Sequence, residues 1–351
     1  MGFMEAARPV SLMRMTMPFP SPTDPATLAE AVRRGDRRAL ARAITLIEST
    51  RADHRAAADA LLERLLPHTG NSVRVGVSGV PGVGKSTFIE AFGLHVLGLG
   101  HRIAVLAIDP SSQRTGGSIL GDKTRMVELS RQPDAFIRPS PAGTTLGGVA
   151  RRTREAMLVC EAAGFDVILV ETVGVGQSET AVADMVDLFL LLLLPGGGDE
   201  LQGIKKGIVE LADLVVVNKA DGELAATARH TVADYRHALA LLRHGADWTV
   251  PVLSCSALRR TGIDAVWTTI GEHRAVMECS GARAARRAEQ ARAWLWSEIR
   301  ESLLEAFRAH PDLRADLPAL EARVARGDMT PTAAARDLLA RFLGGSRGSS
   351  E

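Results

Sequence analysis

The sequence predicts an α/β fold: a mostly parallel sheet with helices on both faces, preceded by a helical extension and followed by a helical arm. Two observations predict this class. Short apolar runs alternate with longer amphipathic stretches between residues 71 and 275, as in strand–helix repeats that build a parallel sheet. Residues 25–66 and the chain beyond about Ile270 show helical periodicity and no strand signal.

Six apolar runs are the predicted strands. They are VRVGVS at 73–78, RIAVLAI at 102–108, DVILVE at 166–171, DLFLLLLL at 187–194, DLVVVNK at 213–219 and VPVLSCS at 250–256. The most apolar run, Leu188–Leu194, is far shorter than the roughly 20 helical residues that cross a bilayer. We therefore expect a central strand that is buried on both faces.

Helical segments flank these strands on both sides. Gly35 and Asp36 divide the first segment into two helices, since glycine ends a helix and aspartate caps the next one. A long helix is expected over 285–310, and two more over 317–343 divided at Gly327-Asp328 and restarted near Thr330-Pro331. The expected organisation is a disordered start (1–24), a helical extension (25–70), a central domain (71–275), a helical arm (276–343) and a loose tail (344–351).

Bulk composition excludes several classes of protein. The 351 residues are 46% hydrophobic and 24% charged with a net charge of +1, so neither nucleic acid nor a membrane is an expected partner. The N-terminal stretch lacks the apolar core of a signal peptide. Three widely spaced cysteines argue against a disulfide framework, and we expect a reducing cytoplasm.

A phosphate-binding loop follows the first predicted strand. The stretch GVPGVGKS, Gly79–Ser86, has the G-x-x-x-x-G-K-[ST] spacing and runs into a helical pattern. Glycines let backbone N–H groups turn toward phosphate oxygens, and the helix N-terminus adds its positive end. Lys85 is expected to reach the β- and γ-phosphates and Ser86 to bind Mg²⁺. The predicted nucleotide contacts are Gly79, Gly82, Val83, Gly84, Lys85, Ser86 and Thr87. This motif predicts the fold of a P-loop NTPase.

Two carboxylates stand at the ends of predicted strands. Asp109 follows the run at 102–108, and Glu171 closes the run at 166–171. Ligands of open α/β sheets bind at the carboxyl ends of strands, and Mg²⁺ prefers oxygen ligands. Both residues are therefore predicted magnesium partners; the alternative for each is a helix cap or a solvated loop charge. Gly174 and Gly176 would allow the loop after Glu171 to approach a γ-phosphate and to move.

The stretch VVVNKAD predicts which base is bound. Asn218, Lys219 and Asp221 form an N-K-x-D pattern at the end of a buried strand. A carboxylate accepts two hydrogen bonds from guanine, whereas adenine would leave it unpaired. Lys219 can lay its aliphatic stem along the base, and Asn218 can tie the loop together or meet the base. Three residues of the following strand end, Ser256, Ala257 and Leu258, are expected to donate backbone N–H groups to the guanine carbonyl. GTP or GDP is the predicted ligand.

With these motifs the chain resembles the MeaB/ArgK family of P-loop GTPases, which is similar to the metallochaperone GTPases and includes relatives of the human protein of cblA-type methylmalonic aciduria. The stretches that carry the resemblance are GVPGVGKST, AIDPSSQRTGGSILGDKTRM, IRPSPAGTTLGGVARRTREAM, VETVGVGQSE, LLLLPGGGDELQGIKKG and NKAD. The resemblance implies a homodimeric GTPase chaperone that gates adenosylcobalamin delivery to an acyl-CoA mutase, typically methylmalonyl-CoA mutase, and protects that enzyme.

The resemblance also implies roles for individual residues. The residues expected around Mg²⁺ are Ser86, Asp109, Asp122 and Glu171, and those expected to act in catalysis are Lys85, Asp109, Glu171 and Lys205. The loop 196–206 carries acidic and basic residues among glycines, which suits a two-state switch that couples the nucleotide to the partner. The alternative is a solvated surface loop.

Other interpretations stay open at this point. Trp294, Ile299, Leu303 and Phe307 have near-helical spacing, which fits either an intramolecular core stripe or, as the resemblance implies, a dimer face. The histidines and cysteines form no evident metal cluster, which argues against a metal-delivery GTPase. A kinase acting on a periplasmic amino-acid transport system is a further alternative, although no feature marks the base that such an enzyme needs. Cys255 is expected to be a buried strand residue.

Overall fold

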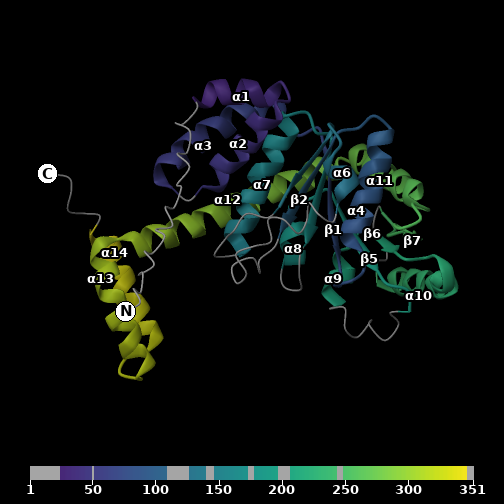
Figure 1. Ribbon diagram of the computed structural model, residues 1–351. Coiled ribbons are helices and arrows are strands. Elements are labelled where there is room, and N and C mark those ends of the chain that lie inside the picture. Colours follow the sequence, from purple (N-terminus) through teal and green to yellow (C-terminus); the bar gives the residue numbers. More distant parts are fainter. Residues whose placement is uncertain are drawn as a thin grey trace, which may run out of the picture.

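The fold comes from a computed structural model, which describes residues 24–49, 51–108, 126–139, 146–172, 178–196, 206–242 and 248–345. The predicted disordered start, 1–24, lies outside these ranges except for Asp24, and the predicted loose tail lies outside them beyond residue 345. The described chain comprises a central α/β body and a helical arm that projects from it (Figure 1).

A seven-stranded sheet forms the centre of the body, in the order β3-β2-β4-β1-β5-β6-β7. Its strands are β1 (Val73–Gly79), β2 (Ile103–Ile108), β3 (Ala135–Arg138), β4 (Val167–Thr172), β5 (Leu188–Leu193), β6 (Leu214–Val217) and β7 (Val252–Ser254). Every described strand pair is parallel, so the predicted parallel sheet is confirmed. The six predicted strands are all present, and β3 is an additional edge strand that the sequence did not reveal.

Alternate residues of β2, β4 and β5 enter different cores, as the twofold side-chain period of a strand requires. On β2, for example, Ala104, Leu106 and Ile108 join one buried cluster, whereas Ile103 and Val105 join the other. Burial on both faces explains why β2 and β5 are continuous apolar runs without a polar side.

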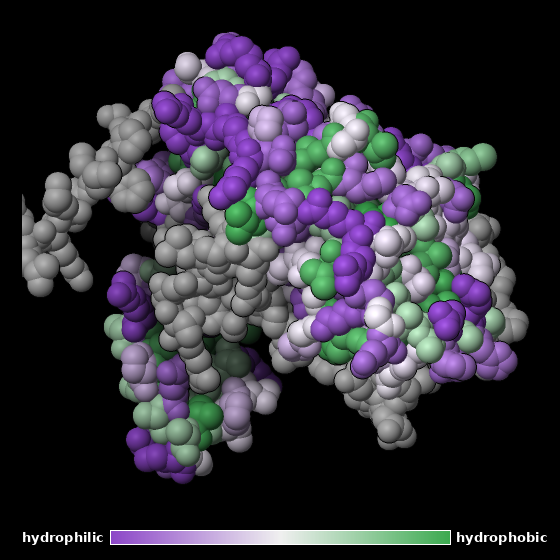
Figure 2. All heavy atoms as spheres, turned by 45° about the vertical axis from the view of Figure 1, so that its right-hand side comes forward, coloured by the Kyte–Doolittle hydropathy of each residue, from purple (hydrophilic) through white to green (hydrophobic). Residues whose placement is uncertain are grey.

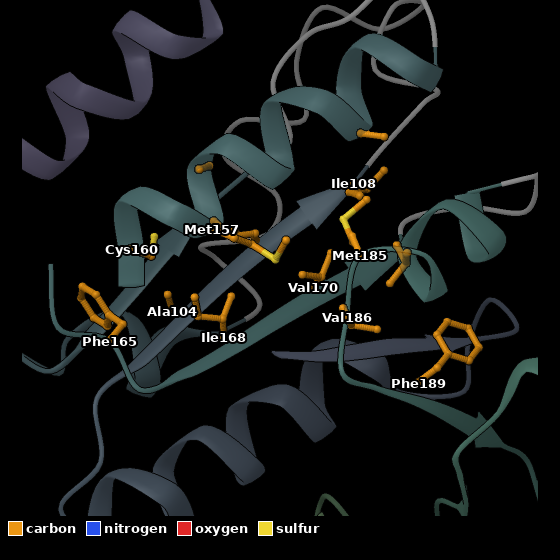
Figure 3. Packing of buried hydrophobic residues seen from close by; sticks show 14 of the residues in the cluster. Ala104, Ile108, Met157, Cys160, Phe165, Ile168, Val170, Met185, Val186 and Phe189 are labelled. Atoms are coloured by element: carbon orange, nitrogen blue, oxygen red, sulfur yellow. The ribbon is translucent and has the colours of Figure 1, made fainter. Parts of the chain in front are cut away.

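Helices cover both faces of the sheet. Those of the body are α4 (Lys85–Gly98), α6 (Val127–Ser130), α7 (Leu146–Ala162), α8 (Ser178–Ala183), α9 (Lys206–Leu211), α10 (Ala225–Leu242) and α11 (Ile263–Cys279), with a 3₁₀ turn, η3, at Gly222–Leu224. Residues of α4, α6 and α11 pack on one face and those of α7, α8 and α10 on the other. In Figure 3, Met157 of α7 reaches toward Ala104, Ile168 and Val170 of the sheet.

The predicted N-terminal helices are present as α1 (Pro25–Arg33), α2 (Arg37–Glu48) and α3 (Ala52–Leu65), followed by a 3₁₀ turn, η1, at Leu66–His68. The break between α1 and α2 falls where it was predicted. Gly35 has a φ of 79°, and the Asp36 side chain accepts hydrogen bonds from the backbone N–H groups of Arg38 and Ala39. These helices share the buried cluster of α7, so the extension packs firmly onto the body.

The arm consists of α12 (Ala282–Ala309), α13 (Pro311–Ala325) and α14 (Pro331–Gly345). The long helix and the division near Gly327 agree with the prediction, but α13 begins at Pro311, six residues before the expected start. Within the described residues, no helix is both long and apolar enough to cross a membrane. The distal end has a small core of its own around Leu313, Leu320 and Leu338.

Candidate functional site

The phosphate-loop motif connects the central strand β1 to helix α4, at the carboxyl edge of the sheet. Gly84 is the N-cap of α4 with a left-handed φ of 92°, and a Cβ atom there would come within 2.9 Å of the Asn218 side-chain nitrogen. A Cβ on Gly79 would lie 2.5 Å from the Leu192 carbonyl oxygen. Both glycines are therefore required by positive φ or by close contact, as a loop that presents its backbone to a ligand demands.

Lys85 points back over this loop. Its ammonium group donates hydrogen bonds to the carbonyl oxygens of Gly79, at 2.8 Å, and Val80, at 3.4 Å. Burial lowers the pKa of Lys85, and the nearby carboxylates of Glu171 and Glu179 oppose that shift. A half-buried cation is thus held at the start of α4, where the helix N-terminus adds further positive potential.

Ser86 and Glu171, two of the predicted magnesium ligands, lie together. The Ser86 hydroxyl is 3.4 Å from Oε1 of Glu171, whose side chain is buried at the end of β4. The next residue, Thr172, is hydrogen-bonded through its hydroxyl to that of Ser78 at 3.0 Å, which joins the ends of β4 and β1. A hydroxyl and a carboxylate converging beside a phosphate loop are a donor set that suits Mg²⁺, which prefers oxygen ligands.

Asn218 joins the phosphate loop to the turn after β7, whose residues Ser256, Ala257 and Leu258 are predicted to contact the base. Its side-chain nitrogen donates to the Val83 carbonyl oxygen at 2.9 Å, and its side-chain oxygen accepts from the Ala257 backbone N–H at 3.1 Å. The side chain is buried, with 1% of the residue exposed. Of the two roles expected for Asn218, the structure shows the structural tie. Cys255 beside it is buried as predicted, and burial raises the pKa of its thiol to about 12.

The remaining base-side residues surround this tie. Lys219 has a φ of 59°, one of two described non-glycine residues with positive φ, and its Cε atom lies near Gly84. Asp221 immediately precedes the η3 turn. Ser256 is fully buried, whereas Leu258 is exposed at the tip of its turn. Lys219 therefore lies beside the phosphate loop, and the turn after β7 is joined to that loop through Asn218, although both lie more than 130 residues from it in the chain.

Several predicted residues lie outside the described part of the chain. These are Asp109, Asp122, Gly174, Gly176 and Lys205. Of the predicted switch loop, only Gly196 and the backbone of Lys206, where α9 begins, are described.

Glu179 is a site residue that the sequence analysis did not single out. It is buried in the first turn of α8, and its charge acts on Lys85. The signal was present as an acidic residue in VGVGQSE, directly after the glycine-rich stretch that follows Glu171. Glu179 lies beyond the end of β4 at Thr172, so a rule based on strand ends does not mark it.

A central strand that runs through a glycine loop into a helix, with an asparagine tying this loop to a second strand end, is the architecture of a P-loop GTPase. A family model described as "Methylmalonyl Co-A mutase-associated GTPase MeaB" matches residues 40–312. The chain belongs to this family, binds GTP and GDP, and hydrolyses GTP.

Individual relatives agree with this assignment. A putative GTPase of Caulobacter vibrioides is 62% identical over 309 residues, which cover 88% of this chain and 94% of the relative. A mouse protein described as "Methylmalonic aciduria type A homolog, mitochondrial" is 52% identical over 320 residues, covering 88% of this chain and 77% of the relative. A crystal structure described as an LAO/AO transport system kinase matches with a TM-score of 0.71 at 39% identity and covers 91% of this chain and 97% of its own.

Proposed function

We propose that this GTPase is a chaperone that gates adenosylcobalamin delivery to a B12-dependent acyl-CoA mutase, methylmalonyl-CoA mutase in the first instance, and protects that enzyme. Membership of a mutase-associated GTPase family supports the choice of partner. The observation that carries the GTP site is Asn218, because its two hydrogen bonds join the phosphate loop to the base-side turn.

The site works by positioning and charge, which are what phosphoryl transfer requires of a protein. We propose that Lys85 leaves the carbonyl oxygens of its own loop to hold the β- and γ-phosphates. Ser86 and Glu171 would hold Mg²⁺ together with Asp109 and Asp122. When bound, the metal neutralises charge on the phosphates.

The guanine assignment is tested at Asp221. Replacing it with alanine removes the acceptor for the two guanine donors, and we expect GTP-over-ATP preference to fall by about 5- to 150-fold, the effect of about 1–3 kcal/mol. Glu223→Ala, two residues further and exposed, is the matched control. Nucleotide binding is measured by fluorescence titration. Unaltered selectivity in Asp221→Ala would refute the assignment of the base-reading residue.

Association with the mutase is tested by size-exclusion chromatography of the two purified proteins with GDP or with a non-hydrolysable GTP analogue. We expect a complex whose stability depends on the nucleotide. The loop 196–206, including Lys205, is the proposed switch that makes this dependence possible. A mutase that elutes separately under every nucleotide condition contradicts the proposed partnership.

Homodimerisation is proposed from the two faces of α12. One face holds the arm to its own body. Arg287 pairs with Asp187. Gln290 donates to the Val186 carbonyl oxygen, and Trp294 donates to the Asp184 carbonyl oxygen. Apolar residues elsewhere on the arm are 49–65% exposed: Leu295, Trp296, Leu303, Leu304, Leu339 and Leu343. Figure 2 shows hydrophobic residues among hydrophilic ones on the surface of the projecting arm. Exposed apolar residues gathered on the two helices α12 and α14 of the arm support an interaction surface there.

The finer assignments are also proposals. We propose a cytoplasmic protein whose G domain spans about 71–275 and whose arm spans 276–343. The kinase alternative receives support only from the description of the structural relative, and the metal-delivery alternative receives none from the described residues. Neither is preferred to the mutase chaperone.

A further inference from the structure

The turn that follows β7 is a compact, closed structure. Ser256 and Thr261 exchange backbone hydrogen bonds of 3.0 and 3.1 Å, and the Arg259 backbone N–H donates to the Ser256 hydroxyl at 3.1 Å. Arg260 inside this turn has a φ of 56°, a conformation that costs a non-glycine residue energy unless its surroundings hold it. Residues 256–258, the proposed guanine contacts, are presented by the same turn.

The Arg260 side chain leaves the turn and reaches helix α6. Its guanidinium donates to the Glu128 carboxylate at 2.7 Å. The backbone N–H of Glu128 in turn donates to the Glu90 carboxylate on α4, also at 2.7 Å. Glu90 thereby caps α6 from another helix, and Met126, the N-cap residue of α6, supplies no side-chain cap itself.

Helix α6 is packed tightly on α4, so this connection is rigid at its far end. A Cβ on Gly93 of α4 would come within 2.8 Å of the Leu129 side chain, and Leu129 is fully buried. Helix α4 itself begins at Lys85, directly after the phosphate loop. The base-side turn is therefore tied to the phosphate-binding helix through Arg260, Glu128 and Glu90.

This connection is a second tie between the same two parts of the site. Asn218 makes the first, which is buried and joins Val83 to Ala257. The second crosses the outside of the molecule, and Arg260 and Glu128 are each more than half exposed. Two ties at different points restrain both displacement and rotation of the turn. A single tie restrains displacement but leaves the turn able to rotate about it.

We propose that Arg260, held by Glu128 and Glu90, is a positioning residue that sets the base-reading turn at its working distance from the phosphate loop. Its guanidinium is engaged with Glu128, so it acts on guanine affinity and selectivity through residues 256–258 of its own turn. The inference rests on the proposed guanine site. Its effect is modest, because an exposed ion pair is worth little and is weakened by salt.

The test compares two neighbouring arginines in the full-length protein. Arg260→Ala removes the tie, whereas Arg259→Ala removes a neighbouring exposed arginine whose side chain pairs with none of the described residues. We expect Arg260→Ala to weaken GDP binding about 1.5- to 5-fold, the range of an exposed pair, and to leave the much weaker ADP binding unchanged. Arg259→Ala should match the parent protein with both nucleotides.

Two further readouts separate positioning from a general loss of structure. The charge exchange Arg260→Glu with Glu128→Arg should restore GDP affinity, whereas either change alone should lower it. The difference between the parent protein and Arg260→Ala should shrink in 1 M NaCl, where the screening length is about 3 Å. In turnover, the KM for GTP should rise with kcat unchanged.

The outcomes distinguish this inference from the guanine assignment itself. If Asp221→Ala abolishes GDP-over-ADP selectivity while Arg260→Ala behaves as Arg259→Ala does, the tie is refuted and the guanine site stands. If Arg260→Ala weakens GDP and ADP equally, or if the charge exchange restores nothing, the positioning role is also refuted. If Asp221→Ala leaves GDP-over-ADP selectivity intact, the guanine assignment fails, and the positioning role of Arg260 that rests on it fails too.

Discussion

Replacing Asn218 by alanine is the most informative perturbation of the site, because one side chain holds two loops. The change removes the donor to the Val83 carbonyl oxygen and the acceptor of the Ala257 N–H, and both residues are buried. A buried polar group that loses its partner costs about 1–3 kcal/mol, so two such groups cost about 2–6 kcal/mol. This is a large part of the 5–15 kcal/mol that typically stabilises a domain.

The assay is urea unfolding of Asn218→Ala with and without GDP. We expect the free energy of unfolding to fall by that amount, and the extra stability that GDP confers, about 2.7 kcal/mol at 100 times its Kd, to shrink because the two loops lose their spacing. Asn71→Ala, at an exposed asparagine, is the control. A loss below about 0.5 kcal/mol, within the range of ordinary surface substitutions, together with an unchanged GDP effect, would refute the tie.

Three other perturbations test the fold, the charge balance and the arm. Gly76→Ala in β1 places a Cβ 2.7 Å from the Val182 side chain of α8, so the free energy of unfolding should fall by about 1–3 kcal/mol. An unchanged free energy of unfolding would contradict this and would mean that α8 moves away without cost. Burial alone would raise the pKa of Glu161, but the buried Arg74 guanidinium holds it below its ordinary value. The ionised Glu161 carboxylate therefore contributes fully to the free energy of unfolding above the ordinary glutamate pKa of about 4.3, and this contribution is lost as pH falls below that value. In urea unfolding, Glu161→Gln should weaken the fall of the unfolding free energy at acid pH. A pH profile identical to that of the parent protein would contradict this. Trp296→Asp, on the exposed apolar part of α12, should convert a dimer to monomer in sedimentation velocity, and a persisting dimer would place the interface elsewhere.

Local chemistry made much of the body predictable from the sequence. Strands buried on both faces read as continuous apolar runs, and the runs at 102–108 and 187–194 became β2 and β5. The phosphate loop was recognisable because its glycines and Lys85 have a fixed spacing that the chemistry imposes. The helix break at Gly35-Asp36 was equally local, since a left-handed glycine and an N-cap need no tertiary partner.

What depends on tertiary contacts was not predictable. The edge strand β3 has four residues, and its last residue, Arg138, pairs with Glu48 of α2, so neither length nor pattern marked it. The four residues proposed as one stripe of the arm divide in the structure. Trp294 contacts the body, Ile299 is half-buried, Leu303 is exposed, and Phe307 packs against the arm's own core. A helical period identifies a face, but it cannot identify what covers that face.

The measurement that tests the proposed function most directly is GTP turnover by the purified protein, alone and with the host's adenosylcobalamin-dependent mutases added one at a time. Hydrolysis by the isolated protein should be slow, because ordering of the catalytic loops is expected to need the partner. We expect one mutase to accelerate turnover and the others to leave it unchanged. An identical rate with every mutase would contradict a partner-coupled GTPase, although the nucleotide site would still stand.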